Sequence, residues 1–107
     1  MFSAVATQLA GQPYVLGYDL FNEPWPGTTW QACGGASGCP SLDQGELAPV
    51  YAKAVTAIRG AADRHLIFGE PFVLFNFGES ATSIPVPGGD SNAGMAFHVY
   101  PLSLIHI

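Results

Sequence analysis

The sequence predicts an α/β protein built on a parallel sheet of about three strands with intervening helices. Three short apolar stretches have the character of strands, residues 14–21, 66–69 and 95–99. Between the first two, residues 43–64 carry apolar side chains at every third or fourth position, which is the period of a helix. Each strand ends in a polar or ionisable residue. Strands alternating with helical stretches in this way are typical of a parallel sheet.

The first elements follow from local patterns. Residues 1–10 place apolar side chains on one helical face, and Gly11 followed by Pro13 ends this helix. Residues 14–21 are apolar almost throughout, which predicts a strand buried on both faces. The composition of residues 25–43 then shifts to Gly, Pro, Ser, Thr and Cys, so we expect a long loop.

The central helix, expected over residues 43–64, begins with the pattern of a capping box, because Glu46 follows Asp43 by three positions. Because of Pro49, the start of regular helix is left open by about one turn. Residues 72–90 are first apolar and then rich in Pro and Gly, which predicts a loop with a weak helix.

The composition indicates a packed interior and excludes several classes of partner. Hydrophobic residues make up 49% of the 107 residues and charged residues only 10%, so we expect one small domain that is the core of something larger. The net charge is −5, with 8 acidic and 3 basic residues and no basic cluster, which argues against nucleic acid and anionic lipid. The most apolar stretch, residues 66–77, is too short for a transmembrane segment, and no signal peptide is visible.

The only two cysteines, Cys33 and Cys39, lie close together among glycines. We favour a disulfide that closes a small loop. Zinc is the alternative, but no histidine lies near this loop and no further ligands have a compatible spacing. A disulfide would indicate that the protein to which the chain belongs is secreted.

The polar residues at the strand ends are the candidate functional residues. In (β/α)₈ barrels, active sites lie where the strands end at the C-terminal face. The residues of this chain that fall at such ends are Asn22, Glu23, Glu70, His98 and Tyr100. The sequence therefore predicts a site at that edge of the sheet.

Glu23 is the candidate general acid/base. It precedes Pro24, which disfavours the helical region for the residue before it, so we expect Glu23 to be extended. Partial desolvation at a barrel rim should raise the pKa of its carboxyl group and keep it protonated near neutrality, as a general acid for a leaving glycosidic oxygen must be. The alternative is a solvated loop glutamate before a turn.

The other candidates are expected to bind substrate. Asn22 would be a buried amide that binds a sugar hydroxyl, and Trp25, with Trp30, would form an apolar platform for a carbohydrate. The alternatives are an Asx-turn residue and ordinary loop packing. His98 and Tyr100 lie two positions apart on a strand, so both face the same side and can bind a substrate hydroxyl or a catalytic carboxylate. The alternative for His98 is a core histidine with satisfied hydrogen bonds.

Glu70 is a second carboxylate at a strand end. The two carboxylates of a retaining glycosidase face each other across the sugar at about 5 Å. Glu70 and Glu23 lie on adjacent strands with one helix between them, which argues against their being acid and nucleophile, although adjacent strands can reach that separation.

Several motifs together resemble glycoside hydrolase family 5, and within it the endoglycoceramidases and related glycosylceramidases. They are YDLFNEPWPG at 18–27, Trp30, Cys33, GCP at 38–40, IRGAADRHLIFGEP at 58–71 and HVY at 98–100. The resemblance implies a (β/α)₈ barrel of which this chain holds roughly strands four to six. Residues 1–101 would be this central part, and residues 102–107 a non-native tail that replaces the expected polar loop.

The resemblance also implies roles for individual residues. Glu23 matches the acid/base, Asn22 the neighbour that binds the sugar 2-hydroxyl, and His98 with Tyr100 the sixth-strand pair that lines the site. The nucleophile of the family ends the seventh strand, beyond this chain. Glu70, on the fifth strand, would then be a pocket-wall or supporting residue.

The expected function is that of a retaining glycosidase fragment that hydrolyses O-glycosidic bonds by double displacement. The resemblance implies no metal or organic cofactor, and a carbohydrate or glycolipid substrate from which glycan is released, with residues 72–77 a candidate lipid-facing surface. The alternatives are a cellulase- or mannanase-like polysaccharide hydrolase and a non-catalytic carbohydrate-binding barrel. With open sheet edges, the chain alone is expected to aggregate and to be inactive.

Overall fold

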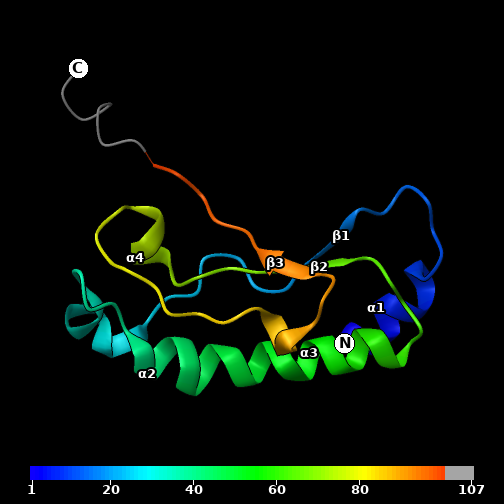
Figure 1. The fold of residues 1–107 in the computed structure, drawn as a ribbon, viewed down its shortest axis with the longest axis horizontal. Helices are drawn as coiled ribbons and strands as arrows, with labels where there is room; N and C mark the ends of the chain where they lie inside the picture. Colours follow the sequence, from blue (N-terminus) through cyan, green and yellow to red (C-terminus); the bar gives the residue numbers. More distant parts are fainter. Residues whose placement is uncertain (101–107) are drawn as a thin grey trace.

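The computed structural model describes residues 1–100 and is an open α/β layer (Figure 1). The expected tail, residues 102–107, lies outside the described residues, as does Pro101. In chain order the elements are α1 (Phe2–Leu9), β1 (Gly17–Asp19), the 3-10 helix η1 (Gly27–Cys33), α2 (Pro40–Leu42), the π-helical turn η2 (Asp43–Leu47), α3 (Ala48–Gly60), β2 (Leu66–Gly69), α4 (Val73–Asn76), the 3-10 turn η3 (Pro87–Gly89) and β3 (Ala93–Met95).

The three strands form one parallel sheet in the order β1-β2-β3, which confirms the predicted fold class. Tyr18 pairs with Ile67, and Ile67 pairs with Ala93. Paired residues of a parallel sheet point to the same face, and this face carries the buried side chains. Figure 1 shows the long helix α3 running along this side of the sheet, with α1 beside it.

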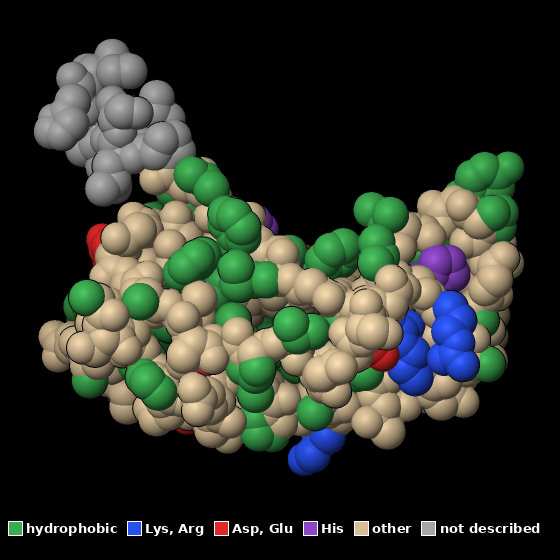
Figure 2. Space-filling model, in the orientation of Figure 1, with side chains coloured by type: hydrophobic (Ala, Val, Ile, Leu, Met, Phe, Trp, Pro, Cys, Tyr) green, Lys and Arg blue, Asp and Glu red, His purple; other side chains and the backbone are tan. Residues whose placement is uncertain are grey.

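The other face of the sheet is open. Leu16 and Phe21, next to β1, are exposed, so the prediction of a first strand buried on both faces is wrong. The reason is that the described helices cover one face only. Figure 2 shows hydrophobic side chains along the hollowed upper surface of the molecule, above the strands.

The strands are shorter than the apolar pattern predicts. β2 has the predicted bounds, whereas β1 keeps only the middle of its predicted range. The third strand was expected at residues 95–99 and lies at Ala93–Met95, because pairing with β2 begins at Ala93 and ends at Met95. His98 and Tyr100 therefore follow β3 and are not part of it.

The helix α3 and the turn η2 before it bury most of the apolar stripe that the sequence predicts. The buried members are Leu47, Tyr51, Ala54, Val55 and Ile58. Val50 and Ala62, which the predicted stripe included, are exposed, and α3 ends at Gly60 before the expected end at Arg64. Pro49 falls in the first turn of α3, where a helix needs no N–H donor, and regular α-helix begins at Ala48, about one turn after Asp43. No helix of the described residues is long and apolar enough to cross a membrane.

The predicted capping box before α3 is wrong. Asp43 is fully buried and caps no helix end. Its Oδ2 accepts hydrogen bonds from the Thr82 hydroxyl at 2.9 Å and from the Ser83 backbone N–H at 2.6 Å. A buried carboxylate must be hydrogen-bonded, and these donors from a distant loop replace the local cap.

The end of β2 is held in place by α3. A Cβ at Gly69 would lie 3.0 Å from the ring of Tyr51 and 2.8 Å from Pro87, so only glycine permits this close approach. One residue further on, the Tyr51 hydroxyl donates to the backbone oxygen of Glu70 at 2.7 Å. The helix thus fixes the point where β2 gives way to the loop that follows.

A buried hydrogen-bond network closes the N-terminal edge of the sheet. The carboxylate of Asp63 accepts hydrogen bonds from the Tyr18 hydroxyl and from the His65 backbone N–H, the latter at 2.8 Å. The Nδ1 of His65 lies 2.6 Å from the same carboxylate. Burial and the hydrogen bond to Asp63 raise the pKa of Tyr18 to about 12, so its hydroxyl keeps its proton and donates.

Candidate active site

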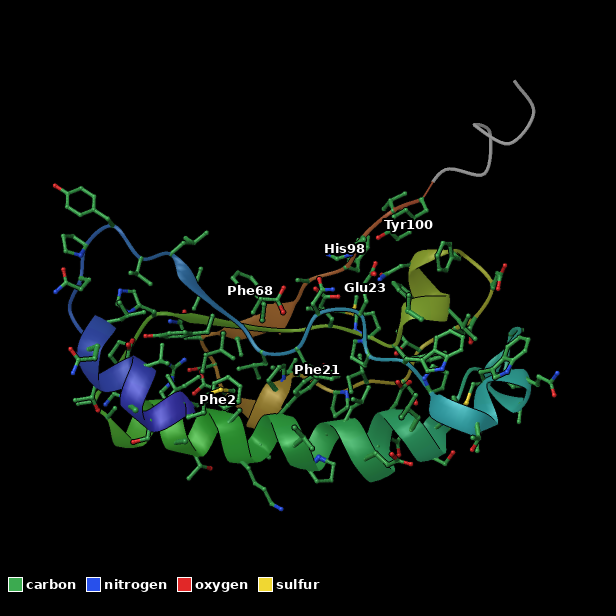
Figure 3. The ribbon with its side chains drawn as sticks, turned by 180° about the vertical axis from the view of Figure 1, so that it is seen from behind. Phe2, Phe21, Glu23, Phe68, His98 and Tyr100 are labelled. Carbon is green, nitrogen blue, oxygen red and sulfur yellow. A yellow bond between two sulfur atoms is a disulfide. The ribbon has the colours of Figure 1, made fainter. Side chains whose placement is uncertain are left out.

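Four of the predicted site residues meet at the C-terminal edge of the sheet. Glu23 lies in the loop after β1, Glu70 follows β2 directly, and His98 with Tyr100 lies in the extended segment after β3. Figure 3 shows Glu23, His98 and Tyr100 close together. Because the strands are parallel, their carboxyl ends share one edge, and this brings to Glu23 residues that lie 47 to 77 positions further along the chain.

The Glu23 carboxylate is held at one oxygen by three side chains. Its Oε1 accepts a hydrogen bond from the Tyr100 hydroxyl, lies 2.7 Å from Nδ1 of His98, and lies 3.5 Å from Nδ2 of Asn76. Among residues 1–100, no side chain or backbone group hydrogen-bonds to Oε2. The half-buried carboxylate is therefore fixed in direction while one oxygen stays available.

The expectation that the pKa of Glu23 is raised is wrong for this arrangement. The hydrogen bonds from Tyr100 and then His98 lower its pKa, and they outweigh the opposing effect of burial. The same contact, followed by the charge of Glu70, raises the pKa of His98. The site as described therefore favours an ionised Glu23 beside a protonated His98.

Pro24 led us to expect an extended backbone at Glu23, and this expectation is wrong. Its φ is 45°, in the left-handed region that side chains with a Cβ rarely adopt. Two hydrogen bonds hold this segment: the Glu23 N–H donates to Oε2 of Glu70 at 2.9 Å, and the Pro24 oxygen accepts from the Val73 N–H at 2.9 Å. Tertiary contacts thus override the local preference.

Glu70 lies beneath the site and does not form an open pocket wall. Its side chain is 0% exposed, and burial, together with the neighbouring carboxylate of Asp19, raises its pKa. Its Oε1 lies 3.4 Å from Nε2 of His98 and has no hydrogen bond within the described residues. Across residues 1–100, no three His, Cys, Asp or Glu side chains are placed to hold a metal ion together.

A different asparagine from the expected one contacts Glu23. Asn22 is exposed, and no described residue hydrogen-bonds to its side chain, so the expected buried amide is absent there. Asn76, at the end of α4, is only 4% exposed; its Oδ1 accepts from the His98 N–H at 3.0 Å and its backbone oxygen from the Tyr100 N–H at 3.4 Å. The sequence signal was present, because Asn76 is a lone amide within an apolar stretch after a strand end.

Two tryptophans form an exposed aromatic surface beside the Glu23 loop. Trp25 and Trp30 stack with ring centroids 6.2 Å apart, and their exposed fractions are 56% and 45%. Trp30 lies in η1, which ends at Cys33, and Cys33 forms the predicted disulfide with Cys39. The disulfide therefore anchors the C-terminal end of the 3-10 helix that carries Trp30.

An apolar cavity of about 390 Å³ adjoins the site. His98 and Tyr100 line it together with Phe75, Phe77, Phe97 and Val99. Phe77 stacks on Tyr100 with ring centroids 4.9 Å apart, so the residues that contact Glu23 also form part of the cavity wall. Two of the lining rings belong to the stretch 72–77 that we considered as a lipid-facing surface.

Comparison with known proteins identifies the family. The family model described as Cellulase (glycosyl hydrolase family 5) matches residues 1–105. The chain belongs to glycoside hydrolase family 5. It is also 36% identical to Endoglycoceramidase I of Rhodococcus hoagii (strain 103S) over 73 residues, which are 68% of this chain and 14% of that protein. The chain thus spans a small part of the length of this relative.

Membership of family 5 confirms the predicted barrel architecture, because this family has the (β/α)₈ fold. The three parallel strands and the helices that cover one face form an open part of such a barrel. Their C-terminal edge, where Glu23, Glu70 and His98 meet, is the edge that holds active sites in this fold. The geometry and the family therefore point to the same place in the molecule.

Proposed function

We propose that this chain supplies the acid/base side of a retaining glycosidase active site, with Glu23 as the acid/base. The observation that carries the proposal is the convergence of Tyr100, His98 and Asn76 on one oxygen of Glu23 at the strand ends. A carboxylate on a solvated loop would not be held by three side chains from two other segments. Membership of family 5 supports the same reaction class.

The direction of the carboxylate suits proton transfer. Because Oε1 is held by its neighbours, Oε2 would face the scissile bond, protonate the leaving oxygen in the first step and remove a proton from water in the second. The nucleophile would be a carboxylate of another strand about 5 Å away. Glu70 is fully buried and lies under Glu23, so it is not in reach of a sugar.

The low pKa of Glu23 suits the second step, in which the group acts as a base. In the first step it must carry a proton. A nucleophilic carboxylate nearby would raise the pKa of Glu23 by like-charge repulsion. Once the nucleophile forms an ester with the sugar, this charge disappears, and the contacts with Tyr100 and His98 would again favour ionised Glu23.

We propose a glycolipid as the substrate. The apolar cavity shares His98 and Tyr100 with the acid/base, and it would accept a hydrocarbon group on the leaving-group side. The similarity to a protein named endoglycoceramidase supports this choice. Disulfides persist in oxidising environments outside the cytosol, so the bond between Cys33 and Cys39 supports the proposal that the whole protein is secreted.

A polysaccharide hydrolase is the second candidate. The stacked and exposed Trp25 and Trp30 beside Glu23 are a flat surface of the kind that sugar rings bind, and the matching family is described as a cellulase family. Under this alternative the aromatic pair, and not the cavity, would set specificity.

The proposal is tested in a chimera in which this chain replaces the matching segment of the Rhodococcus hoagii enzyme, which supplies the remaining strands. We expect the chimera to release intact glycan from a ganglioside and to leave β-glucan uncut. Release of glucose oligomers from β-glucan without glycan release would favour the polysaccharide alternative. Absence of both activities in a folded chimera would contradict the catalytic proposal and leave a non-catalytic barrel.

The role of Glu23 is tested in the same chimera with Glu23→Gln. We expect a loss of about 10²- to 10⁴-fold on ganglioside, the usual contribution of general acid/base catalysis. The loss should be smaller for an aryl glycoside, whose leaving group needs no proton. The control is Glu79→Gln, which removes the same charge from an exposed side chain. Equal activity of the two variants would refute the assignment of Glu23.

A further inference from the structure

Glu70 is a buried carboxylate that touches the acid/base segment at two separate points. Its Oε2 accepts the backbone N–H of Glu23 at 2.9 Å. Its Oε1 lies 3.4 Å from Nε2 of His98, whose Nδ1 lies 2.7 Å from the Glu23 carboxylate. Each oxygen of Glu70 thus reaches Glu23, one directly and one through an imidazole ring.

We propose that Glu70 is a positioning residue for the acid/base, which anchors the Glu23 backbone with one carboxylate oxygen and orients the His98 ring with the other. This inference rests on the proposed function of Glu23. It assigns no chemical step to Glu70, because its side chain is 0% exposed and touches no space that a substrate can enter.

The backbone contact matters because of the conformation of Glu23. Its φ of 45° is disfavoured for a residue with a Cβ, and the proline that follows favours an extended backbone instead. An unfavourable conformation persists only where surrounding groups fix it. The acceptor on Glu70 is the described group that holds the Glu23 N–H, so it aims the side chain towards His98 and Tyr100.

The ring contact matters because His98 lies between two carboxyl groups. Nδ1 is within hydrogen-bond distance of Glu23, at 2.7 Å, whereas Nε2 lies 3.4 Å from Glu70, which is an ion-pair contact without a hydrogen bond. Negative charge on both sides favours His98 with a proton on both nitrogens. The remaining polar groups around Glu70 are the Asp19 carboxylate from β1 and the Tyr51 hydroxyl from α3, which binds the backbone oxygen of Glu70. Neither of them contacts His98 by a described hydrogen bond.

Glu70→Gln separates the two contacts. A glutamine keeps an oxygen for the Glu23 N–H, but its NH₂ group would face Nε2 of His98 and favour a neutral ring that accepts there. Glu79→Gln is the matched control, since it removes one negative charge from an exposed position. Both variants are made in the chimera, and His98 is identified as the ¹⁵N-histidine signal that is lost in His98→Gln.

The test is an NMR titration of His98, which does not depend on activity. We expect Glu70→Gln to lower the pH at which His98 titrates and to place the remaining proton on Nδ1, whereas Glu79→Gln changes neither. The kcat/KM on ganglioside should fall about 10- to 100-fold, as for other losses of precise placement, with a changed pH profile. Identical His98 titration in both variants would overturn the proposal, even if Glu70→Gln lost activity.

A second variant covers the case in which Glu70→Gln does not fold. His98→Gln changes a side chain that is partly exposed and leaves the buried Glu70 unchanged. The titration of the Glu70 carboxyl carbon should then move to higher pH, because the carboxylate loses a cation. No movement would overturn the inference. An inactive but folded chimera with the expected titrations would contradict the proposed function alone and leave this contact network standing.

Discussion

The Nδ1 of His98 lies 2.7 Å from Oε1 of Glu23, although the two residues are 75 positions apart. This contact joins the loop after the first strand to the segment after the third, and it exists because the parallel sheet puts both strand ends at one edge. Tyr100 donates to the same oxygen. The protonation of Glu23 is therefore set by a segment far away in the chain, and this leads to a prediction for the pH profile.

Replacing Tyr100 by phenylalanine should raise the pKa of Glu23, because the Tyr100 hydrogen bond is the largest cause of its lowering. In kcat/KM the free enzyme must carry a protonated Glu23, so the high-pH limb reports this pKa. In Tyr100→Phe that limb should move to higher pH, and the maximum should fall by about 10-fold as the carboxylate loses a fixed contact.

The matched control for this measurement is Tyr14→Phe. Tyr14 is 97% exposed, and its hydroxyl makes no described hydrogen bond, so its removal should leave the profile of kcat/KM unchanged. A high-pH limb that stays in place in Tyr100→Phe, or moves to lower pH, would show that Tyr100 does not control Glu23.

The place of the site was predictable, and several of its details were not. The apolar strands and the polar residues at their ends are local features, so Glu23, Glu70 and His98 could be assigned to one edge from the sequence. The φ of Glu23 could not be predicted, since the preference for an extended backbone before Pro24 is overridden by the hydrogen bond that Glu23 donates to Glu70, 47 positions away. Local rules fail where a distant partner supplies the larger contribution.

The same reason explains Asn76 and the pKa of Glu23. Asn22 stands beside Glu23 in the sequence, but Asn76 reaches its carboxylate because the short helix α4 folds back over the loop. No local pattern predicts where that helix lies relative to the loop. A desolvated rim was expected to raise the pKa of Glu23, and the donors that lower it come from positions 98 and 100. Burial alone is a poor guide when the partners are unknown.

Removing the disulfide should destabilise the loop between Cys33 and Cys39, which directly follows the 3-10 helix η1. The bond joins residues six positions apart, and closing a loop of this size restricts the unfolded chain by about 2 kcal/mol. Cys33→Ser with Cys39→Ser should lower the free energy of unfolding by about this amount in urea titrations of the chimera. Cys33 is buried, and its backbone oxygen accepts a hydrogen bond from the Ser80 hydroxyl at 2.7 Å. If the backbone at Cys33 moves when the disulfide is removed, weakening of this hydrogen bond adds to the loss of stability.

A reductant provides the control for the disulfide. With dithiothreitol, the wild-type chimera should approach the stability of the double variant, and the difference between the two should nearly vanish. A difference that stays the same under reducing conditions would mean that the serine side chains, and not the missing bond, cause the loss.

The raised pKa of Tyr18 predicts that the folded chain loses stability at high pH. Its pKa is raised to about 12, whereas an unfolded tyrosine titrates near 10. The folded chain therefore keeps a proton that the unfolded chain releases, and this stabilisation is complete below pH of about 10 and is lost as the pH rises towards 12. Tyr51, whose pKa is also raised by burial, adds to the same trend.

The variant Tyr18→Phe tests this. Its fall in unfolding free energy between pH 9 and 12 should be smaller than in wild type. At pH 7 the variant should lose about 1–3 kcal/mol, because buried Asp63 is left with one donor fewer. Urea titrations across this pH range check both effects, with Tyr14→Phe as the control. An unchanged alkaline slope in Tyr18→Phe would show that the hydroxyl does not hold its proton against Asp63.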